Sequence, residues 1–214
     1  LGVCAVLAVP MTRRHGGALA AAARTVRASG PAAGLRFSIS FPASASSTPQ
    51  TGHIILIVSR DTSAEPPFQY HVYSPDVQPG FGLDVSRLAP GQAAVIDGTV
   101  FGWPLRSVND LPAGDYRVQA VFNRYETFHR ADGHTLLLPP DRGEDQDMQS
   151  KPGNLYSLPE TVHLDPQRPG TLRLVLTQEI PPIEPPADTP WIKHVRIQSK
   201  RLSAFWGQPM YLSA

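Results

Sequence analysis

The stretch LPAGDYRVQAVFNRYETF, residues 111–128, decides the fold of this chain. Its apolar side chains recur at every second position, at Tyr116, Val118, Ala120 and Phe122. Polar side chains stand between them, at Arg117, Gln119 and Asn123. A period of two with one apolar side is typical of a β-strand that packs on a core. Pro112 and Gly114 precede it and favour a tight corner. We therefore predict a corner followed by one long, central strand.

The start of this strand carries a further signal. Tyr116 stands two residues after Gly114, just where the strand begins. This arrangement resembles the tyrosine corner of immunoglobulin-like sandwiches, in which a buried tyrosine bonds through its hydroxyl to the upstream backbone. The resemblance implies a β-sandwich centred on this strand. An ordinary edge hairpin is the alternative.

The composition suits a compact β domain. The chain has 214 residues, of which 41% are hydrophobic and 17% charged, so it can bury a core and is not disordered by composition. Its 23 prolines are about twice the usual share of roughly 5%, and they favour short strands with many corners. The net charge of +1 argues against a nucleic-acid-binding surface.

The first 34 residues differ from the rest. A short apolar run, a basic stretch and an Ala-rich segment follow one another there, which resembles a secretory signal peptide, with Met11 as an alternative start. The apolar runs are too short to span a bilayer. We expect a disordered leader and a secreted or periplasmic location, or else a leader without a targeting role. Cys4 is the single cysteine, which excludes disulfides and cysteine-based zinc sites within the chain.

Strand patterns recur over the next 150 residues. Alternating or continuous apolar runs predict strands at 35–41, 52–59, 68–73, 93–97, 161–164 and 172–176. Prolines and glycines predict an irregular connection over 75–92, and residues 101–105 are expected to anchor a loop on the core. The fold class is therefore all-β: an immunoglobulin-like β-sandwich over residues 35–180 with a long irregular loop at 129–158.

A Pro-rich linker is predicted at residues 181–190. Residues 191–214 follow it and predict a β-hairpin with a turn at 203–207. Two strands cannot bury a core of their own. They either pack back onto the sandwich or begin a domain that is cut off.

The last residues, VRIQSKRLSAFWGQPMYLSA at 195–214, resemble the start of the catalytic domain of bacterial putative esterases. These are relatives of the enterochelin-esterase and mycolyltransferase type of α/β-hydrolase. The strand at 111–125 and the segment GNLY at 153–156 resemble the β-rich N-terminal region of such proteins. The resemblance implies a partner, a C-terminal α/β-hydrolase domain of the same polypeptide.

The nucleophile motif of that family is missing. An α/β-hydrolase holds its serine in a G-x-S-x-G turn, and the sequence has no such pentapeptide. Phosphate-binding G-x-G-x-x-G and G-x-x-x-x-G-K-[ST] patterns are also absent. The resemblance therefore implies a portion without its catalytic domain, and no catalytic residue is carried over to this chain.

A polar cluster follows the central strand. Its members are Glu126, His129, Asp132, His134, Asp141, Glu144, Asp145 and Asp147. Carboxylates bind Ca²⁺, and carboxylates with imidazoles bind Zn²⁺ or Fe²⁺. A turn at Asp132 and Gly133 would bring His129 and His134 together. The candidate metal ligands are Glu126, His129, Asp132, His134, Asp141 and Asp145. A solvated acidic loop is the alternative, favoured because EF-hand and H-E-x-x-H spacings are lacking.

Exposed aromatic side chains are a second candidate site, since flat rings with polar edges bind carbohydrates. The candidates are Tyr70, Tyr73, Phe81, Trp103, Tyr125 and Tyr156. Core or loop anchoring is their alternative role.

Three functions remain open. The first is a non-catalytic module of an esterase-like serine hydrolase, with residues 129–158 as the contact surface for the catalytic domain. The second is a stand-alone Ca²⁺- or carbohydrate-binding module. The third is a small enzyme with an unrecognised site.

Overall fold

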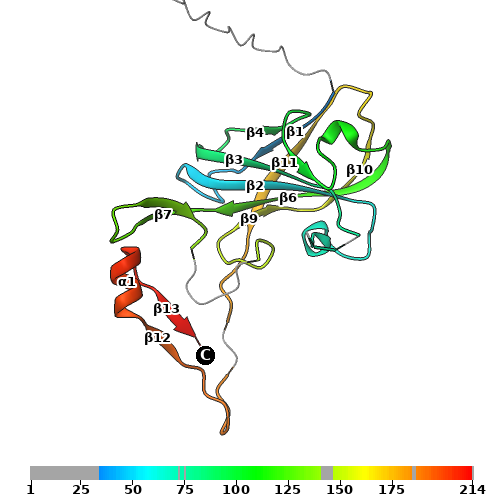
Figure 1. Cartoon of the computed structure of the whole chain (residues 1–214). Helices are drawn as coiled ribbons and strands as arrows, with labels where there is room; N and C mark the ends of the chain where they lie inside the picture. Colours follow the sequence, from blue (N-terminus) through cyan, green and yellow to red (C-terminus); the bar gives the residue numbers. More distant parts are fainter. Residues whose placement is uncertain (1–33, 72, 75, 141–146, 185–186, 214) are drawn as a thin grey trace, which may run out of the picture. The chain divides into compact units, whose positions relative to one another are not determined.

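The computed structural model describes residues 34–71, 73–74, 76–140, 147–184 and 187–213. The expected leader lies outside these residues, apart from Gly34. Strands predominate (Figure 1), so the all-β prediction is confirmed. The strands that build the main sheet are β1 (Leu35–Ser40), β2 (Gln50–Ser59), β3 (Gly80–Leu88), β4 (Ala94–Ile96), β5 (Gly102–Trp103), β6 (Gly114–Arg124), β9 (Leu155–Ser157), β10 (Glu160–Leu164) and β11 (Gly170–Glu179).

Within the described residues these strands form one curled sheet in the order β4-β1-β11-β9-β6-β2-β3-β5, with β10 also beside β6. Strand β11 connects two parts of the sheet, β4-β1 on one side and β9-β6-β2-β3-β5 on the other. Its first residues pair in parallel with β1, from Leu35 opposite Gly170 onwards. Its last residues pair antiparallel with β9, where Leu176 lies opposite Ser157. The two parts enclose one core, as in a β-sandwich.

The core confirms the period of two that was read from β6. Its alternate residues Tyr116, Val118, Ala120 and Phe122 are all buried. They meet buried side chains of β1 and β2, namely Phe37, Ile39, Ile54, Leu56 and Val58. Burying each large apolar side chain contributes about 1.5–3 kcal/mol relative to leaving it exposed. The central position of β6 follows from this apolar face and from β2, which pairs with it along eight residues from Gly52 to Ser59.

The corner before β6 has the hydrogen bond that the tyrosine-corner resemblance implies. The hydroxyl of Tyr116 donates to the carbonyl oxygen of Pro112 at 2.6 Å. The guanidinium of Arg60 lies over the ring, 4.8 Å from its centroid. Just upstream, the short 3-10 turn η2 (Val108–Asp110) is closed by a capping box between Ser107 and Asp110. The corner is therefore held by side chains at both ends.

Two sequence predictions upstream of β6 are wrong. Strand β3 lies within the supposedly irregular segment 75–92. Conversely, the strand expected at 68–73 is absent from its described residues, which instead contain part of the 3-10 turn η1 (Pro66–Gln69). The cause is tertiary packing. A Cβ atom at Gly80 or Gly82 would collide with the ring of Tyr70 or His53, respectively, so these glycines give the rings room over β3.

The segment after β6 is more ordered than the predicted loop. The long strand stops at Arg124 and resumes as β7 (Glu126–His129), which forms a hairpin with β8 (Thr135–Leu138). The anchoring role expected for residues 101–105 falls to Leu105, which packs against the core, since the rings of Phe101 and Trp103 are exposed. The described residues of the predicted linker, 181–184 and 187–190, contain neither helix nor strand.

The C-terminal hairpin is confirmed, with a helix in place of its predicted turn. Strand β12 (Arg196–Gln198) pairs antiparallel with β13 (Tyr211–Ser213). Helix α1 (Lys200–Trp206) lies between them, capped by the side chain of Ser199 at its start and by Gly207, in the left-handed conformation, at its end. In the part of the chain that is described, no helix is long and apolar enough to cross a membrane.

Candidate functional site: a pocket on the outer face of β6

Strand β6 carries a second row of side chains that points away from the core, because side chains alternate along a strand. Gln119 lies opposite Ile57 of β2, and Val121 lies between Ile55 of β2 and Tyr156 of β9. Both Gln119 and Val121 are nevertheless only 1% exposed. The outer face of the sheet is therefore covered here.

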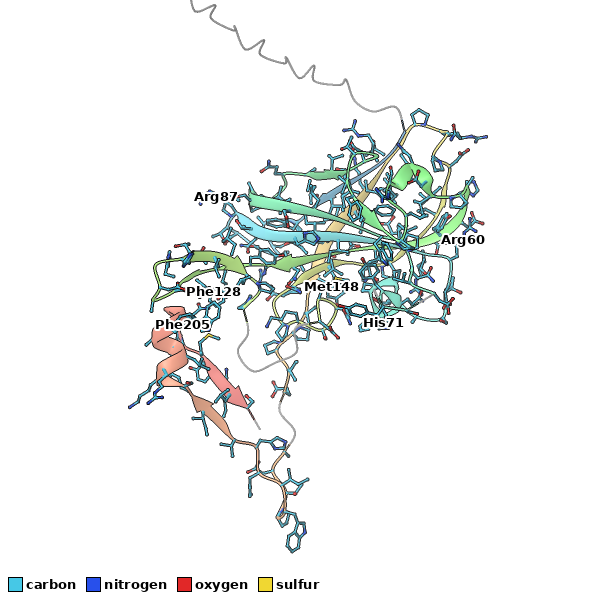
Figure 2. All side chains as sticks on the ribbon, in the orientation of Figure 1. Arg60, His71, Arg87, Phe128, Met148 and Phe205 are labelled. Carbon is cyan, nitrogen blue, oxygen red and sulfur yellow. The ribbon has the colours of Figure 1, made fainter. Side chains whose placement is uncertain are left out.

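Loops and η1 form this cover and leave a pocket of about 250 Å³. Its walls are Glu65, Pro67, Phe68, Gln119, Val121, Gln149, Tyr156, Ile180 and Pro181. Figure 2 labels two residues of the bordering segments: Met148, which precedes Gln149, and His71, which follows η1. The pocket thus joins four segments that are far apart in the sequence.

Gln119 is the buried polar group at the base of the site. Its Nε2 donates to Glu65 Oε2 and to the carbonyl oxygen of Ser157, each at 2.9 Å. Both partners are acceptors, so they fix the orientation of the amide. Its Oε1 is buried and has no hydrogen-bond partner among the described residues. A buried acceptor left unpaired costs about 1–3 kcal/mol. This oxygen is therefore the group of the site that lacks a donor.

Backbone hydrogen bonds hold the walls in place. The amide of Gly153 donates to the carbonyl oxygen of Ile180, and the amide of Ile180 donates to that of Asn154, each at 2.9 Å. The side-chain Oδ1 of Asn154 accepts from the amide of Arg124 at 3.0 Å. On the other side, Arg117 Nη1 donates to the carbonyl oxygen of Ala64 at 3.3 Å, next to Glu65. Two of these bonds, at Arg124 and Arg117, attach the walls to strand β6.

The chemistry of the walls is apolar with a few hydrogen-bonding groups. Phe68 is 53% exposed and Tyr156 half-buried, so both rings present apolar surface at the site. Glu65, Gln119 and Gln149 supply one carboxylate and two carboxamides. Among the described residues of the walls there is no lysine, arginine or histidine, so these walls favour hydrogen-bond donors over anions.

The predicted metal ligands on the β7–β8 hairpin have other partners. His129 lies opposite Thr135, with its Nδ1 3.2 Å from Thr135 Oγ1. His134 Nδ1 lies 3.1 Å from Asp132 Oδ1, and Arg130 Nη2 lies 2.5 Å from Asp132 Oδ2. The turn thus gives the two imidazoles different partners, and Arg130 compensates the charge of Asp132.

The pKa of Asp132 reflects this pairing. Burial alone would raise it, but hydrogen bonds from His134 and the charge of Arg130 outweigh burial and lower it. Asp141 and Asp145 lie outside the described residues. Among the residues that are described, no three His, Cys, Asp or Glu side chains are grouped to hold one metal ion. The six-residue metal site accordingly stays a prediction.

The six aromatic candidates separate into different environments. Phe81 is buried in the core, whereas Tyr73 is 99% exposed and Trp103 is also exposed. Burial raises the pKa values of Tyr70 and Tyr125, and the charge of Asp84 adds to the shift at Tyr125. Of the six, Tyr156 lines the pocket.

The sequence patterns missed Glu65, Phe68, Gln119 and Gln149 as site residues. Gln119 stands on the polar side of β6, where a solvated side chain was the expectation. Searches against protein-family models, curated proteins and solved structures found no match to the chain. The geometry described above is therefore the basis for a function.

Proposed function

We propose that the chain is an accessory β-sandwich module of an esterase-like serine hydrolase. In this role it binds the catalytic α/β-hydrolase domain of the same polypeptide and shapes access to its active site, without performing the chemistry. The likeness of residues 195–214 to the start of such a catalytic domain supports the proposal, together with an exposed apolar surface on the same residues.

That surface is the observation that carries the proposal. Ile197 of β12 and Leu212 of β13 are paired directly and therefore share one face, and they are 57% and 56% exposed. Val195 precedes Ile197 by two residues and is also exposed. On the other face, the guanidinium of Arg196 lies 4.1 Å from the ring centroid of Tyr211. A two-stranded sheet with one uncovered apolar face is typical of a surface that a partner covers.

The C-terminal hairpin that carries the apolar face is attached to the β7–β8 hairpin through helix α1. Helix α1 contacts the β7–β8 hairpin, through the ring of Trp206 against Phe128 and a hydrogen bond from the amide of Ala131 to the carbonyl oxygen of Phe205. The hairpin continues from β6 after a single residue. A partner that covers Ile197 and Leu212 would therefore contact a surface connected to the central strand.

The first test is the coding DNA beyond Ala214. Within about 50 residues after it we expect an α/β-hydrolase domain, with a G-x-S-x-G serine followed by an Asp or Glu and a His. A different domain, or the end of the reading frame, would contradict the accessory role.

The second test uses the whole polypeptide, because residues 195–214 resemble the start of the catalytic domain and a cut at Ala214 would divide that domain. Ile197→Asp combined with Leu212→Asp should lower the melting temperature of the catalytic domain, because both charges would lie on the apolar face that it covers. Val175→Asp is the matched control, since Val175 is an exposed strand residue on β11. Equal melting temperatures of the two variants would place the interface elsewhere.

A third test addresses catalysis. We expect no hydrolysis of p-nitrophenyl esters by the purified 214-residue chain above the rate of buffer. Turnover that a serine-reactive fluorophosphonate abolishes would instead favour the small-enzyme alternative.

We also infer a secreted or periplasmic location from the signal-like leader. The whole chain fused to alkaline phosphatase, which is active outside the bacterial cytoplasm, should give active reporter. Deletion of residues 1–34 should abolish this activity. An equally active deletion variant would contradict the inference.

A further inference from the structure

We propose that the pocket on the outer face of β6 binds a small, uncharged, polyhydroxylated ligand of the size of one hexose ring. This binding role goes beyond the accessory function and does not depend on it. The carrying observation is the juxtaposition, in one pocket, of a buried amide oxygen without a donor and two accessible aromatic rings.

The unpaired oxygen sets the polarity of the ligand. Glu65 and Ser157 take both hydrogen bonds that Gln119 donates, so its Oε1 offers only an acceptor. A ligand hydroxyl that reaches this buried oxygen supplies the missing donor. The same hydroxyl, or its neighbour on a sugar ring, can accept a hydrogen bond from the amide of Gln149. A ligand with several adjacent hydroxyls satisfies this mixture of groups better than one with a single polar atom.

The charge of the described wall residues disfavours anionic ligands. An anionic ligand would approach the carboxylate of Glu65, and the described part of the wall holds no lysine, arginine or histidine to compensate its charge. The carboxylate of Glu65 keeps its negative charge after accepting from the neutral amide of Gln119, so an organic cation is the competing ligand class that the experiment has to test. A neutral polyol needs no charge compensation on either side.

The size and the rings fit one pyranose. The volume of about 250 Å³ lies just below the range of roughly 300–1,000 Å³ that holds drug-sized ligands, so it suits a single ring. The C–H face of a sugar ring packs against flat apolar surface, which Phe68, Tyr156 and Pro181 provide.

The experiment is a titration of the ¹⁵N-labelled chain with glucose, galactose and mannose, followed by two-dimensional NMR. We expect shifts of the amides of Phe68, Gln119 and Tyr156 for at least one hexose, with a Kd on the order of millimolar for so small a ligand. Glucose 6-phosphate and choline are the contrasting ligands. Absence of hexose binding, or binding of choline in place of hexoses, overturns the proposal.

Variants then locate the site. Phe68→Ala removes a ring that is 53% exposed, and it should weaken hexose binding roughly three- to tenfold. Phe101→Ala is the matched control, because Phe101 is 66% exposed and lies outside the pocket. Glu65→Gln keeps an oxygen for the bond from Gln119 and should also weaken binding. If Phe68→Ala and Phe101→Ala bind the hexose equally well, the pocket is not the site.

Discussion

The ring of Phe128 meets the ring of Trp206 edge to face, with centroids 5.6 Å apart and an angle of 80° between their planes. Phe128 belongs to β7 and Trp206 to α1, so the contact joins the helix of the C-terminal hairpin to the strand that follows β6. Arg130 adds to it, with its guanidinium 4.8 Å from the ring centroid of Phe205. Phe128 is 4% exposed, which makes this a small core of its own.

The contact should show energetic coupling in a double-mutant cycle. Phe128→Leu and Trp206→Leu each remove one ring, and the double variant removes both. We expect a coupling free energy of about 0.5–1.5 kcal/mol, the usual value for an edge-to-face aromatic pair. Chemical denaturation of the four proteins measures it.

A control for this cycle is Trp191→Leu combined with Phe128→Leu. Trp191 is 92% exposed, so its coupling with Phe128 should be indistinguishable from zero. Zero coupling between Phe128 and Trp206 themselves would show that α1 does not stay on the hairpin in solution.

The hydroxyl of Tyr116 offers a second prediction. Tyr116→Phe leaves the ring in the core and removes the 2.6 Å hydrogen bond to Pro112. The free energy of unfolding should fall by about 0.5–1.5 kcal/mol. Tyr73→Phe is the control, because Tyr73 is 99% exposed and its hydroxyl meets water in the folded and unfolded chain. Equal stability of the two variants would mean that the hydroxyl contributes nothing to the corner.

Strands whose pattern and packing agree could be predicted from the sequence. The alternation of Phe37, Ile39 and Phe41 predicted β1, and all three side chains are buried. Strand β3 could not be predicted, because glycines such as Gly80 and Gly82 are typical of turns. Their role in a strand depends on the rings of Tyr70 and His53, which occupy the space that a Cβ atom would fill. Local sequence gives no sign of such a contact, which is why tertiary packing overrides propensity there.

The sequence identified Tyr156 as a candidate pocket residue but not Gln119, and the difference again lies in tertiary packing. Tyr156 was a candidate because aromatic residues often bind ligands, whatever their neighbours are. Gln119 was not, because the polar side of an alternating strand normally faces water. Its burial depends on η1 and on the segment around Gln149, and these approach β6 only in the folded chain.

Glycine at position 52 should be essential for the pairing of β2 with β6. A Cβ atom there would collide with the backbone carbonyl oxygen of Asn123, which cannot rotate away as a side chain could. Gly52→Ala should therefore lower the free energy of unfolding by about 1–3 kcal/mol, as overpacking does elsewhere. Thermal or chemical denaturation measures the loss.

Gly170→Ala is the matched control, since Gly170 also lies in a strand and its nearest heavy atom, the carbonyl oxygen of Arg168, is 4.0 Å from the added Cβ. Its stability should stay within about 0.5 kcal/mol of the parent. A Gly52→Ala variant as stable as Gly170→Ala would show that β2 and β6 are not in this register.

Asp97 should make the free energy of unfolding depend on pH in the acid range. Hydrogen bonds from the hydroxyl of Thr99 at 2.6 Å and from its amide at 3.0 Å lower the pKa of Asp97, with burial opposing them. The folded pKa therefore lies below the unfolded value of about 3.9. The contribution to stability is present above that pH and is lost as the pH falls through the folded pKa. Water screens the site, so we expect on the order of 0.5 kcal/mol or less.

Thr99→Val removes the hydroxyl and should raise the pKa of Asp97 toward its ordinary value. A ¹³C titration of the carboxyl group measures this shift, and denaturation between about pH 5 and 2 should show a weaker loss of stability for Thr99→Val than for the parent. Thr171→Val is the control, because Thr171 is an exposed strand residue on β11. An unchanged pKa of Asp97 in Thr99→Val would mean that the backbone amide of Thr99 and the charge of Arg36 lower it without the hydroxyl.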